Sequence, residues 1–375
     1  MLRLTAAFLI IGLLLTVQYL LVTHSSATVT RLTNTAEHAI NLNPTLSDDG
    51  RIVAFESSAD LFGTGETAAF RAVRAELNGV SVFESIGHTR AVAPAFSSDG
   101  KILVFASTED LVGQNADRNS EIFLFDGSVI KQLTNTQPDA TTLRLSDGNL
   151  QPSVTSDGRT IVFSSNRDLC GANPDLTFEI FLYDTLGQRF VQLTDGANEY
   201  SAVSPKISGD GSRVYYKRTT AATPGAGDLV LIDTKTGASQ VVAAAVPDLS
   251  ITDGRAISND GMRAVYSAEV APNQSQVFVS EARDNSIRQV TQLGSRSVDV
   301  KLQATISGDG KRIAFATRRR VLNASDGGVE LYLLDLPTGQ FQQITNAPSS
   351  ATAEVVASLN FDGSLVAFNF ARILS

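Results

Sequence analysis

Tryptophan is absent from this 375-residue chain, which has one cysteine, two methionines and three histidines. A single cysteine, Cys170, cannot form an intrachain disulfide, so we expect packing rather than covalent bonds to stabilise the fold. Outside the apolar leader the only histidines are His38 and His88, both in polar surroundings. A histidine-based metal cluster or a Ser-His-Asp triad needs more partners, and no Gly-x-Ser-x-Gly elbow occurs.

Positive charge is also scarce, with 30 Lys and Arg against 39 Asp and Glu and a net charge of -9. This balance argues against nucleic acids and anionic membrane surfaces as partners. The run Arg318-Arg319-Arg320 is the one basic cluster, and we interpret it as solvated surface.

One long apolar run is present, from Leu4 to Val22, and it follows Arg3. Small residues at Ser25 and Ala27 fit the spacing of a signal-peptidase site, so we interpret residues 1–27 as an export signal cleaved after Ala27. The alternative is an uncleaved anchor, because about 19 apolar residues span a bilayer. Both interpretations place residues 28–375 in the periplasm or outside the cell.

The rest of the chain has no long amphipathic helical pattern but repeats one short motif. The glycine of an Asp-Gly pair recurs about every 50 residues, at Gly50, Gly100, Gly158, Gly211, Gly261, Gly310 and Gly363. An apolar residue stands four positions before each glycine. An aromatic residue stands five positions after it, at Phe55, Phe105, Phe163, Tyr216, Tyr266, Phe315 and Phe368. Asp-Gly between short β-rich runs predicts a tight antiparallel hairpin in every repeat, with the aspartate serving the turn.

Two more strands are predicted after most hairpins. A third strand begins with an acid or amide and ends in an acid, as in Glu121 to Asp126 and Glu330 to Asp335. A fourth strand ends in a Leu-Thr-like pair, as in Lys131 to Thr134. A four-stranded sheet of this kind has two apolar faces, and radial stacking of copies buries both. The chain is therefore predicted to be all-β, a seven-bladed β-propeller with four-stranded blades.

The ends of the chain suggest how the ring closes. Val29 to Thr33 matches the fourth strand of a blade, whereas Glu354 to Phe370 supplies only the first two strands of blade seven. We expect the N-terminal strand to complete the last blade. Because a third strand of that blade is missing, the alternative is a chain truncated in blade seven.

The pattern Pro-x-apolar-Ser-x-Asp-Gly, followed by Glu-Ile-aromatic and Leu-Thr, resembles the TolB-type propeller repeat, a relative of the WD-repeat propellers. Its proline stands at Pro44, Pro94, Pro152 and Pro205 and is replaced in the later repeats. The resemblance covers nearly all of residues 28–375 and implies an exported propeller that binds other proteins. TolB carries an α/β domain before its propeller, so we expect a TolB-type protein other than TolB.

One loop has a pattern that a calcium ion could use. Oxygen-bearing side chains alternate at Asn115, Asp117, Asn119 and Glu121, with a weaker copy at Asn173, Asp175 and Glu179. Calcium takes six to eight oxygen ligands, but the glycine and final acid of an EF-hand are not at their spacing, and Asn and Asp also form turns. These four residues are the candidate metal site, and no other cofactor is expected.

The sequence predicts a monomeric, non-catalytic binding or scaffolding module whose protein partner sits over one propeller face. It names no catalytic residue, because the residues shared among repeats are the structural ones. Two alternatives remain. One is a propeller hydrolase or lyase acting on a sugar or peptide, and the other is the accessory propeller of a longer surface enzyme.

Overall fold

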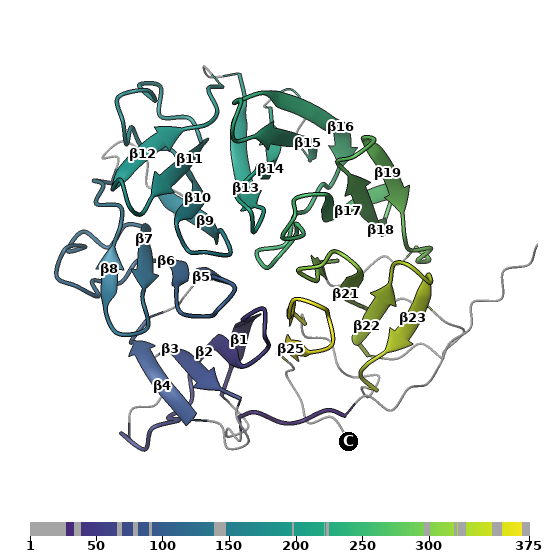
Figure 1. Ribbon diagram of the computed structural model, residues 1–375, viewed down its shortest axis with the longest axis horizontal. Helices are drawn as coiled ribbons and strands as arrows, with labels where there is room; N and C mark the ends of the chain where they lie inside the picture. The colour runs from purple at the N-terminus through teal and green to yellow at the C-terminus, as the bar shows by residue number, and fades with distance from the viewer. Residues whose placement is uncertain are drawn as a thin grey trace, which may run out of the picture.

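The computed structural model describes residues 28–33, 39–65, 70–77, 82–89, 92–138, 148–196, 199–220, 222, 225–295, 301–318, 321, 328–346 and 355–369. These residues form β-strands and connecting loops. Figure 1 shows the sheets arranged in a ring around a common centre, as in a β-propeller. Among these residues, no helix is long and apolar enough to span a bilayer. The predicted export signal, residues 1–27, lies outside the described part of the chain.

The first three repeats each form a four-stranded antiparallel sheet. Their strands are β1 (Asn41–Leu46), β2 (Ile52–Ser57), β3 (Arg71–Glu76) and β4 (Val82–Gly87); β5 (Val92–Phe96), β6 (Leu103–Ser107), β7 (Glu121–Phe125) and β8 (Ile130–Gln132); and β9 (Asn149–Val154), β10 (Thr160–Ser165), β11 (Glu179–Asp184) and β12 (Arg189–Gln192).

Later sheets vary more in strand number, being four-, three-, four- and two-stranded in chain order. Their strands are β13 (Ser201–Ile207), β14 (Arg213–Thr219), β15 (Ala226–Asp233) and β16 (Ser239–Pro247); β17 (Arg263–Ala271), β18 (Gln274–Glu281) and β19 (Ser286–Gln289); β20 (Ala304–Ile306), β21 (Arg312–Thr317), β22 (Glu330–Asp335) and β23 (Gln340–Gln343); and β24 (Ala357–Leu359) and β25 (Val366–Phe368).

The prediction of seven four-stranded blades is therefore correct for the fold but too regular. Six sheets in the described residues have the three or four strands of a blade, and the seventh position holds only the pair β24–β25. In the fifth repeat, residues 250–257 meet β17 only through the isolated bridges Ser250–Ser267 and Ile257–Ala264. A bend at Asp253 and Gly254 interrupts the ladder there, which leaves three strands.

The predicted N-terminal fourth strand is also absent from the described sheets. Residues 28–33 form no strand. They run along the outer rim from the first repeat past β25 in Figure 1. Leu32 packs against a cluster that includes Leu46 and Phe55. Ala367 of β25 packs against the same cluster. The segment therefore contacts the seam between the last and the first sheets through side chains rather than through a backbone ladder.

The hydrophobic core lies between neighbouring sheets. One cluster joins the first two sheets through Phe105 and Phe123, and another joins the second and third through Phe163 and Phe181. These aromatic rings stack in pairs, with centroids 5.8 Å apart for Phe105 and Phe123. The repeated aromatic residues are buried in the first six repeats, so they pack within the core between sheets.

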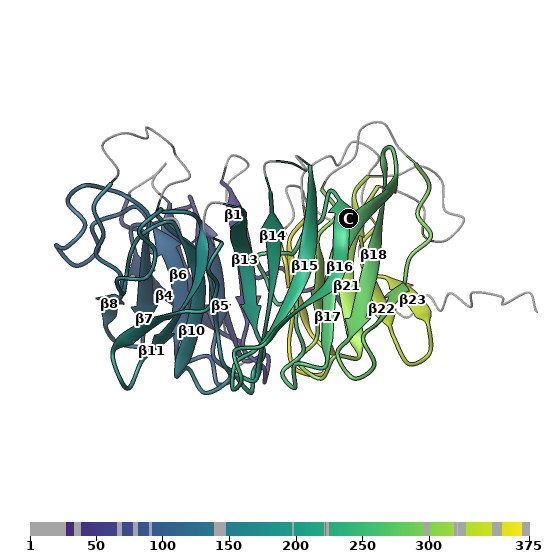
Figure 2. The same ribbon diagram turned by 90° about the horizontal axis from the view of Figure 1, so that it is seen from above.

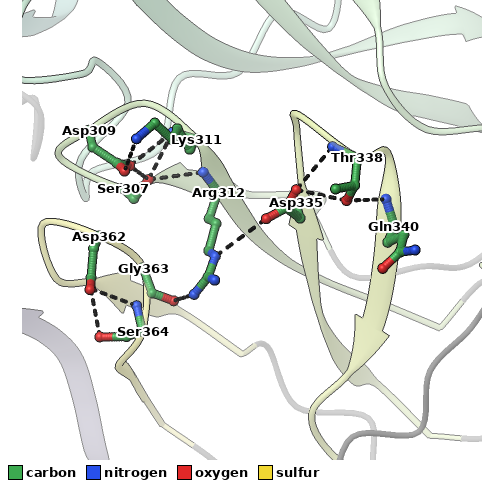
Figure 3. A network of polar contacts seen from close by, with 10 residues as sticks. All are labelled: Ser307, Asp309, Lys311, Arg312, Asp335, Thr338, Gln340, Asp362, Gly363 and Ser364. Atoms are coloured by element: carbon green, nitrogen blue, oxygen red, sulfur yellow. Dashed lines mark hydrogen bonds and ion pairs between the residues drawn. The ribbon is translucent and has the colours of Figure 1, made fainter.

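Each Asp-Gly pair makes the tight turn that the sequence predicts. In the sixth repeat, the Ser307 hydroxyl donates to Asp309 Oδ1 at 2.7 Å and accepts the Arg312 backbone N–H at 2.9 Å (Figure 3). The glycine that follows has a φ of 69°, a left-handed conformation that side chains disfavour. Arg312 Nη1 also donates to the carbonyl oxygen of Gly363 at 3.1 Å, so neighbouring turns are tied together.

These turns form a closed ring of backbone hydrogen bonds around the channel. The Asp48 N–H donates to Ser98 O at 2.9 Å, and each turn donates to the next around the molecule. The Phe361 N–H finally donates to Asp48 O at 2.9 Å, which closes the ring between the last and the first repeats. The seven aspartates before glycine thus have the turn role that was predicted for them.

The Glu and Leu-Thr positions of the repeat serve the second half of each blade. Thr345 Oγ1 accepts the Leu331 N–H at 2.9 Å and donates to Glu330 Oε2 at 2.6 Å. The second, third and fifth repeats use Thr134, Thr194 and Thr291 to accept the equivalent N–H groups. A buried hydroxyl thereby extends the pairing of the third and fourth strands beyond the ladder.

The meander gives the propeller two different faces. The Asp-Gly turns and the turns between third and fourth strands share one end, which we call the turn face. The loops between second and third strands share the other end, which we call the loop face and which lies along the upper edge of Figure 2.

Candidate functional site

The channel contains a cavity of about 50 Å³ between the innermost strands. Its walls include Lys206 from β13, Asp253 and Arg255 from the bend in the fifth repeat, and Ser358 from β24. The cavity has room for one or two water molecules, so any ligand group that enters it must be small.

An ion pair crosses the channel near the turn face. Arg255 Nη2 donates to Asp48 Oδ1, and the two residues lie 207 positions apart in the chain. Asp48 Oδ2 also accepts from Asn259 Nδ2 at 2.7 Å and from the Ser98 hydroxyl. The side chains are only 19% and 11% exposed for Arg255 and Asp48. These three side-chain donors come from the second and fifth repeats, so the Asp48 carboxylate of the first repeat is a structural tie between them.

Lys206 is the most deeply buried cation in this channel, with 2% of the residue exposed. Its ammonium group donates to the backbone carbonyl of Asp253 at 2.6 Å. Burial lowers the pKa of Lys206 to about 8, while the charge of Asp253 acts in the opposite direction. Burial dominates because a carbonyl oxygen and one partly exposed carboxylate replace little of the lost hydration.

A second polar link crosses the channel nearer the loop face. Gln151 Nε2 donates to Asp253 Oδ1 at 3.3 Å, and Gln151 Oε1 accepts the Ser204 N–H at 2.9 Å. Gln151 and Ser204 both lie at β-bulges of their first strands and have positive φ angles of 55° and 56°. The bulges turn Gln151 towards its neighbours, so the third, fourth and fifth repeats are joined across the channel.

The loop face carries a motif that the sequence reasoning missed. Ser-x-x-Asp-Leu-x-Gly occurs in each of the first three repeats, at 57–63, 107–113 and 165–171. In every copy the serine hydroxyl accepts the N–H two residues later, at 3.0 to 3.1 Å. The aspartates, Asp60, Asp110 and Asp168, accept backbone N–H groups from the far side of their loops. These hydrogen bonds lower the pKa of Asp60 and of Asp168.

The second and third repeats share still more of this frame. Asn115 Nδ2 donates to the carbonyl oxygens of Asn119 and Glu109, and Asn173 Nδ2 donates to those of Thr177 and Arg167. Both amides therefore hold the loop closed from inside. The side chains presented on these frames differ, however.

The tips of these two loops are left-handed residues with different chemistry. Arg118 has a φ of 58° and Leu176 a φ of 55°, and each donates its N–H to the framing asparagine. Arg118 is exposed and forms an ion pair with Glu109. Leu176 is 42% exposed. Two adjacent blades thus present a charged tip and an apolar tip on the same scaffold.

The calcium candidate lies on this frame. The backbone and amide of Asn115 belong to the loop frame, and the Asn119 amide donates to Thr136 O at 2.6 Å. Glu121 accepts from Thr136 N–H at 2.6 Å and from Asn149 Nδ2 at 2.9 Å, whereas Asp117 is exposed. In the described residues there is no cluster of three or more His, Cys, Asp or Glu side chains. Calcium at Asn115, Asp117, Asn119 and Glu121 remains a prediction.

The other residues noted in the sequence do not gather into one site. His88 follows β4 at the loop end of the first sheet, and His38 lies outside the described residues. Cys170 is an exposed free thiol within a loop-face frame. The missed loop motif could have been found in the sequence, because its three copies have the same spacing. The channel pair of Asp48 and Arg255 could not, since nothing local links them.

Several solved structures are similar to this chain, and one of them is a β-propeller domain. An oligogalacturonate lyase from Vibrio parahaemolyticus is 11% identical over 88% of each chain, with a TM-score of 0.60. The β-propeller domain of the Trilobed protease from Pyrococcus furiosus is 13% identical over 86% of this chain and 87% of that one, with a TM-score of 0.53. TolB from Acinetobacter baumannii is 20% identical over 66% of this chain but 53% of that one, with a TM-score of 0.46.

The arrangement of the sheets and the likeness to the Pyrococcus furiosus propeller domain define the class as that of the β-propellers. The chain is also similar to TolB and TolB-like structures. All of these identities are low, so the likeness concerns the fold. No protein-family profile and no curated protein matches the chain. Function must therefore be argued from this chain's own residues.

Proposed function

We propose that this protein is an exported, non-catalytic propeller that binds a protein partner over its loop face. The observation that carries this proposal is the loop frame of the first three repeats. Three adjacent blades hold their loops with the same serine and aspartate hydrogen bonds, while the tips of the second and third loops, Arg118 and Leu176, differ. A rigid scaffold with variable tips is how many binding surfaces achieve specificity at low entropic cost.

The polar groups of the described channel favour a binding role over catalysis. Asp48 is engaged by three side-chain donors, and Lys206 is bound to a carbonyl oxygen. Among the described acids, Glu179 is the one whose pKa is raised, by burial. It accepts hydrogen bonds from Thr194 and Gly196 inside a blade. A general acid would instead need to lie at the channel mouth, within reach of a substrate. The enzymatic alternative rests on named neighbours such as the oligogalacturonate lyase, with which the chain shares a fold.

Export is the second part of the proposal. It rests on the apolar run Leu4 to Val22 and the small residues Ser25 and Ala27, which together fit a cleaved signal. The expected location is the periplasm or the extracellular space, and the expected state is a monomer.

Ring closure is the third part. We propose seven blades in which residues 28–33 serve the last one as a rim latch. The hydrogen bond from Phe361 N–H to Asp48 O and the shared packing of Leu32 and Ala367 support this role. The Pyrococcus furiosus propeller domain is described as having an open velcro topology, so propellers of this shape do not all close through a strand.

The test compares matched substitutions on the two faces. Leu176→Asp alters an exposed leucine on the loop face, and Leu186→Asp alters one that is 73% exposed on the turn face. Tagged residues 28–375 and both variants are incubated with extract of the exported compartment, and bound proteins are identified by mass spectrometry. We expect a stoichiometric partner that the wild type and Leu186→Asp retain and that Leu176→Asp loses. A partner lost only with Leu186→Asp, or no partner for any folded bait, would contradict the proposal.

A further inference from the structure

Lys206 is an exception among the residues that the repeat places beside the channel. The position five residues before each turn glycine holds a small or hydroxyl-bearing side chain in every other repeat. The seven residues are Thr45, Ala95, Ser153, Lys206, Ala256, Thr305 and Ser358. Lys206 is the one charged residue in this set, so the repeat itself does not require a cation here.

The ammonium group of Lys206 has more donors than acceptors. Its Nζ donates to Asp253 O at 2.6 Å, and the residue is 2% exposed. An ammonium carries three N–H donors, so two of them have no acceptor in the described part of the chain. The lysines that form ion pairs among the described residues are Lys101, Lys131 and Lys311. Lys206 is therefore a buried cation without a counter-ion in contact.

The charged groups nearest to Lys206 do not neutralise it. The Asp253 carboxylate belongs to an exposed residue, and its Oδ1 accepts from Gln151 Nε2 at 3.3 Å. Its charge favours the ammonium form, but burial outweighs it and lowers the pKa of Lys206 to about 8. Arg255 and Asp48 neutralise each other in their own ion pair. The desolvation cost of the buried charge is thus largely uncompensated.

This cation forms part of the wall of the cavity in the channel, together with two serines that have protons to donate. Ser153 Oγ accepts the Ile207 N–H at 3.2 Å, and Ser358 Oγ accepts the Leu46 N–H at 3.1 Å. Neither hydroxyl donates to an acceptor among the described residues, so both keep a free proton. The wall therefore offers an ammonium group and hydroxyl donors around one small space.

The cavity is open to solvent and small. Asp253, which is exposed, and Arg255, whose side chain is 19% exposed, line the same space as Lys206. An ion can therefore enter along the channel. The volume of about 50 Å³ suits one atomic ion and is too small for a side chain of a partner protein. A water molecule would accept an N–H group but leave the charge, whereas a small anion would satisfy both.

We propose that the channel holds a small monovalent anion of the size of chloride, bound to the Lys206 ammonium group. The anion accepts from the N–H groups that Asp253 O leaves free, so it helps to hold the fourth repeat against the fifth. This site is separate from the loop face and does not depend on the proposed partner. Because the anion stabilises the charged amine, it reduces the cost of burying Lys206.

Chloride is the first probe, and gluconate is the comparison because it is too large for the cavity. Thermal unfolding of residues 28–375 is followed at pH 7 in sodium chloride and in sodium gluconate at equal ionic strength. We expect the wild-type Tm to rise with chloride concentration beyond the gluconate series, as mass action requires of a ligand that binds the folded state. Lys206→Met should lose this difference between the two salts. Its stability advantage over wild type should therefore be smaller in chloride than in gluconate.

Two further variants separate the site from general effects of charge. Lys217→Met is the matched control, since Lys217 donates to Leu249 O at 2.8 Å but lies outside the cavity wall, and it should keep the chloride response. Ala95→Val adds two methyl groups at another residue of the wall and retains Lys206. It should lose the chloride response because the space is filled. If Ala95→Val does not fold, the comparison of Lys206→Met with Lys217→Met still decides.

The pH dependence and a direct view of the ion complete the test. The chloride response of wild type should be full at pH 7 and fade as the pH rises above 8, because only the ammonium form binds the anion. Crystals grown in sodium bromide should show an anomalous peak beside Lys206 Nζ in wild type and none in Lys206→Met. Equal chloride responses in wild type and Lys206→Met would overturn the site. A wild-type channel without bromide would do the same.

Discussion

Replacing Lys206 by methionine should remove a pH-dependent cost of folding. Lys206 is almost fully buried, and its pKa is lowered from 10.5 to about 8 in the folded protein. At about 1.4 kcal/mol per unit of pKa, that difference corresponds to about 3 kcal/mol. The methionine side chain has a similar volume and no charge, so it fills the same space in the channel.

The sign follows from proton linkage. Between pH 8 and 10.5 the unfolded chain keeps the Lys206 proton while the folded protein has released it. Stability therefore rises with pH across this window, and the full cost applies below pH 8. Buried Tyr266, whose pKa is raised to about 12, acts oppositely above pH 10 because unfolding frees it to ionise. The difference between wild type and Lys206→Met removes that common contribution.

Urea unfolding of both proteins from pH 7 to pH 10.5 measures this difference. We expect Lys206→Met to be more stable than wild type near pH 7, by up to about 3 kcal/mol less the lost hydrogen bond to Asp253. The advantage should shrink as pH rises through the window. Lys217→Met is the control, since Lys217 also donates to a backbone carbonyl, that of Leu249, but is only about half buried. A stability difference for Lys206→Met that does not change with pH would refute the reasoning.

Two further predictions concern ring closure. Gly308→Ala should destabilise the fold by about 1 to 3 kcal/mol, because the added methyl would lie 2.7 Å from Arg255 Nη1 and from the Phe361 ring. Gly294→Ala is the control, since its methyl would enter open space. The urea midpoints of the two variants are compared with that of the wild type. Leu32→Ala should cost about 1 to 2 kcal/mol if residues 28–33 serve as a latch, since Leu32 packs on the core of the first blade, and an unchanged midpoint would argue against the latch.

The turn chemistry shows why so much of the fold can be predicted. An Asp-Gly turn depends on residues within five positions of one another, such as Ser307, Asp309 and Arg312. The period of the repeats then fixes the number of hairpins and the need for stacking. Two departures remain. Asp253 and Gly254 bend the first strand of the fifth repeat, and in the described residues the last sheet has only the pair β24 and β25.

The candidate surfaces likewise combine features set by local sequence with features set by tertiary structure. Local sequence by itself determined the hairpins, the aromatic packing between sheets and, in a motif that was overlooked, the rigid loops of the first three repeats. Tertiary structure alone decided that Arg255 meets Asp48 across the channel and that the buried Lys206 ammonium has a single carbonyl acceptor among the described residues. The physical reason is that turn and strand signals act over a few residues, whereas desolvation and charge pairing depend on which distant segments the closed ring brings together.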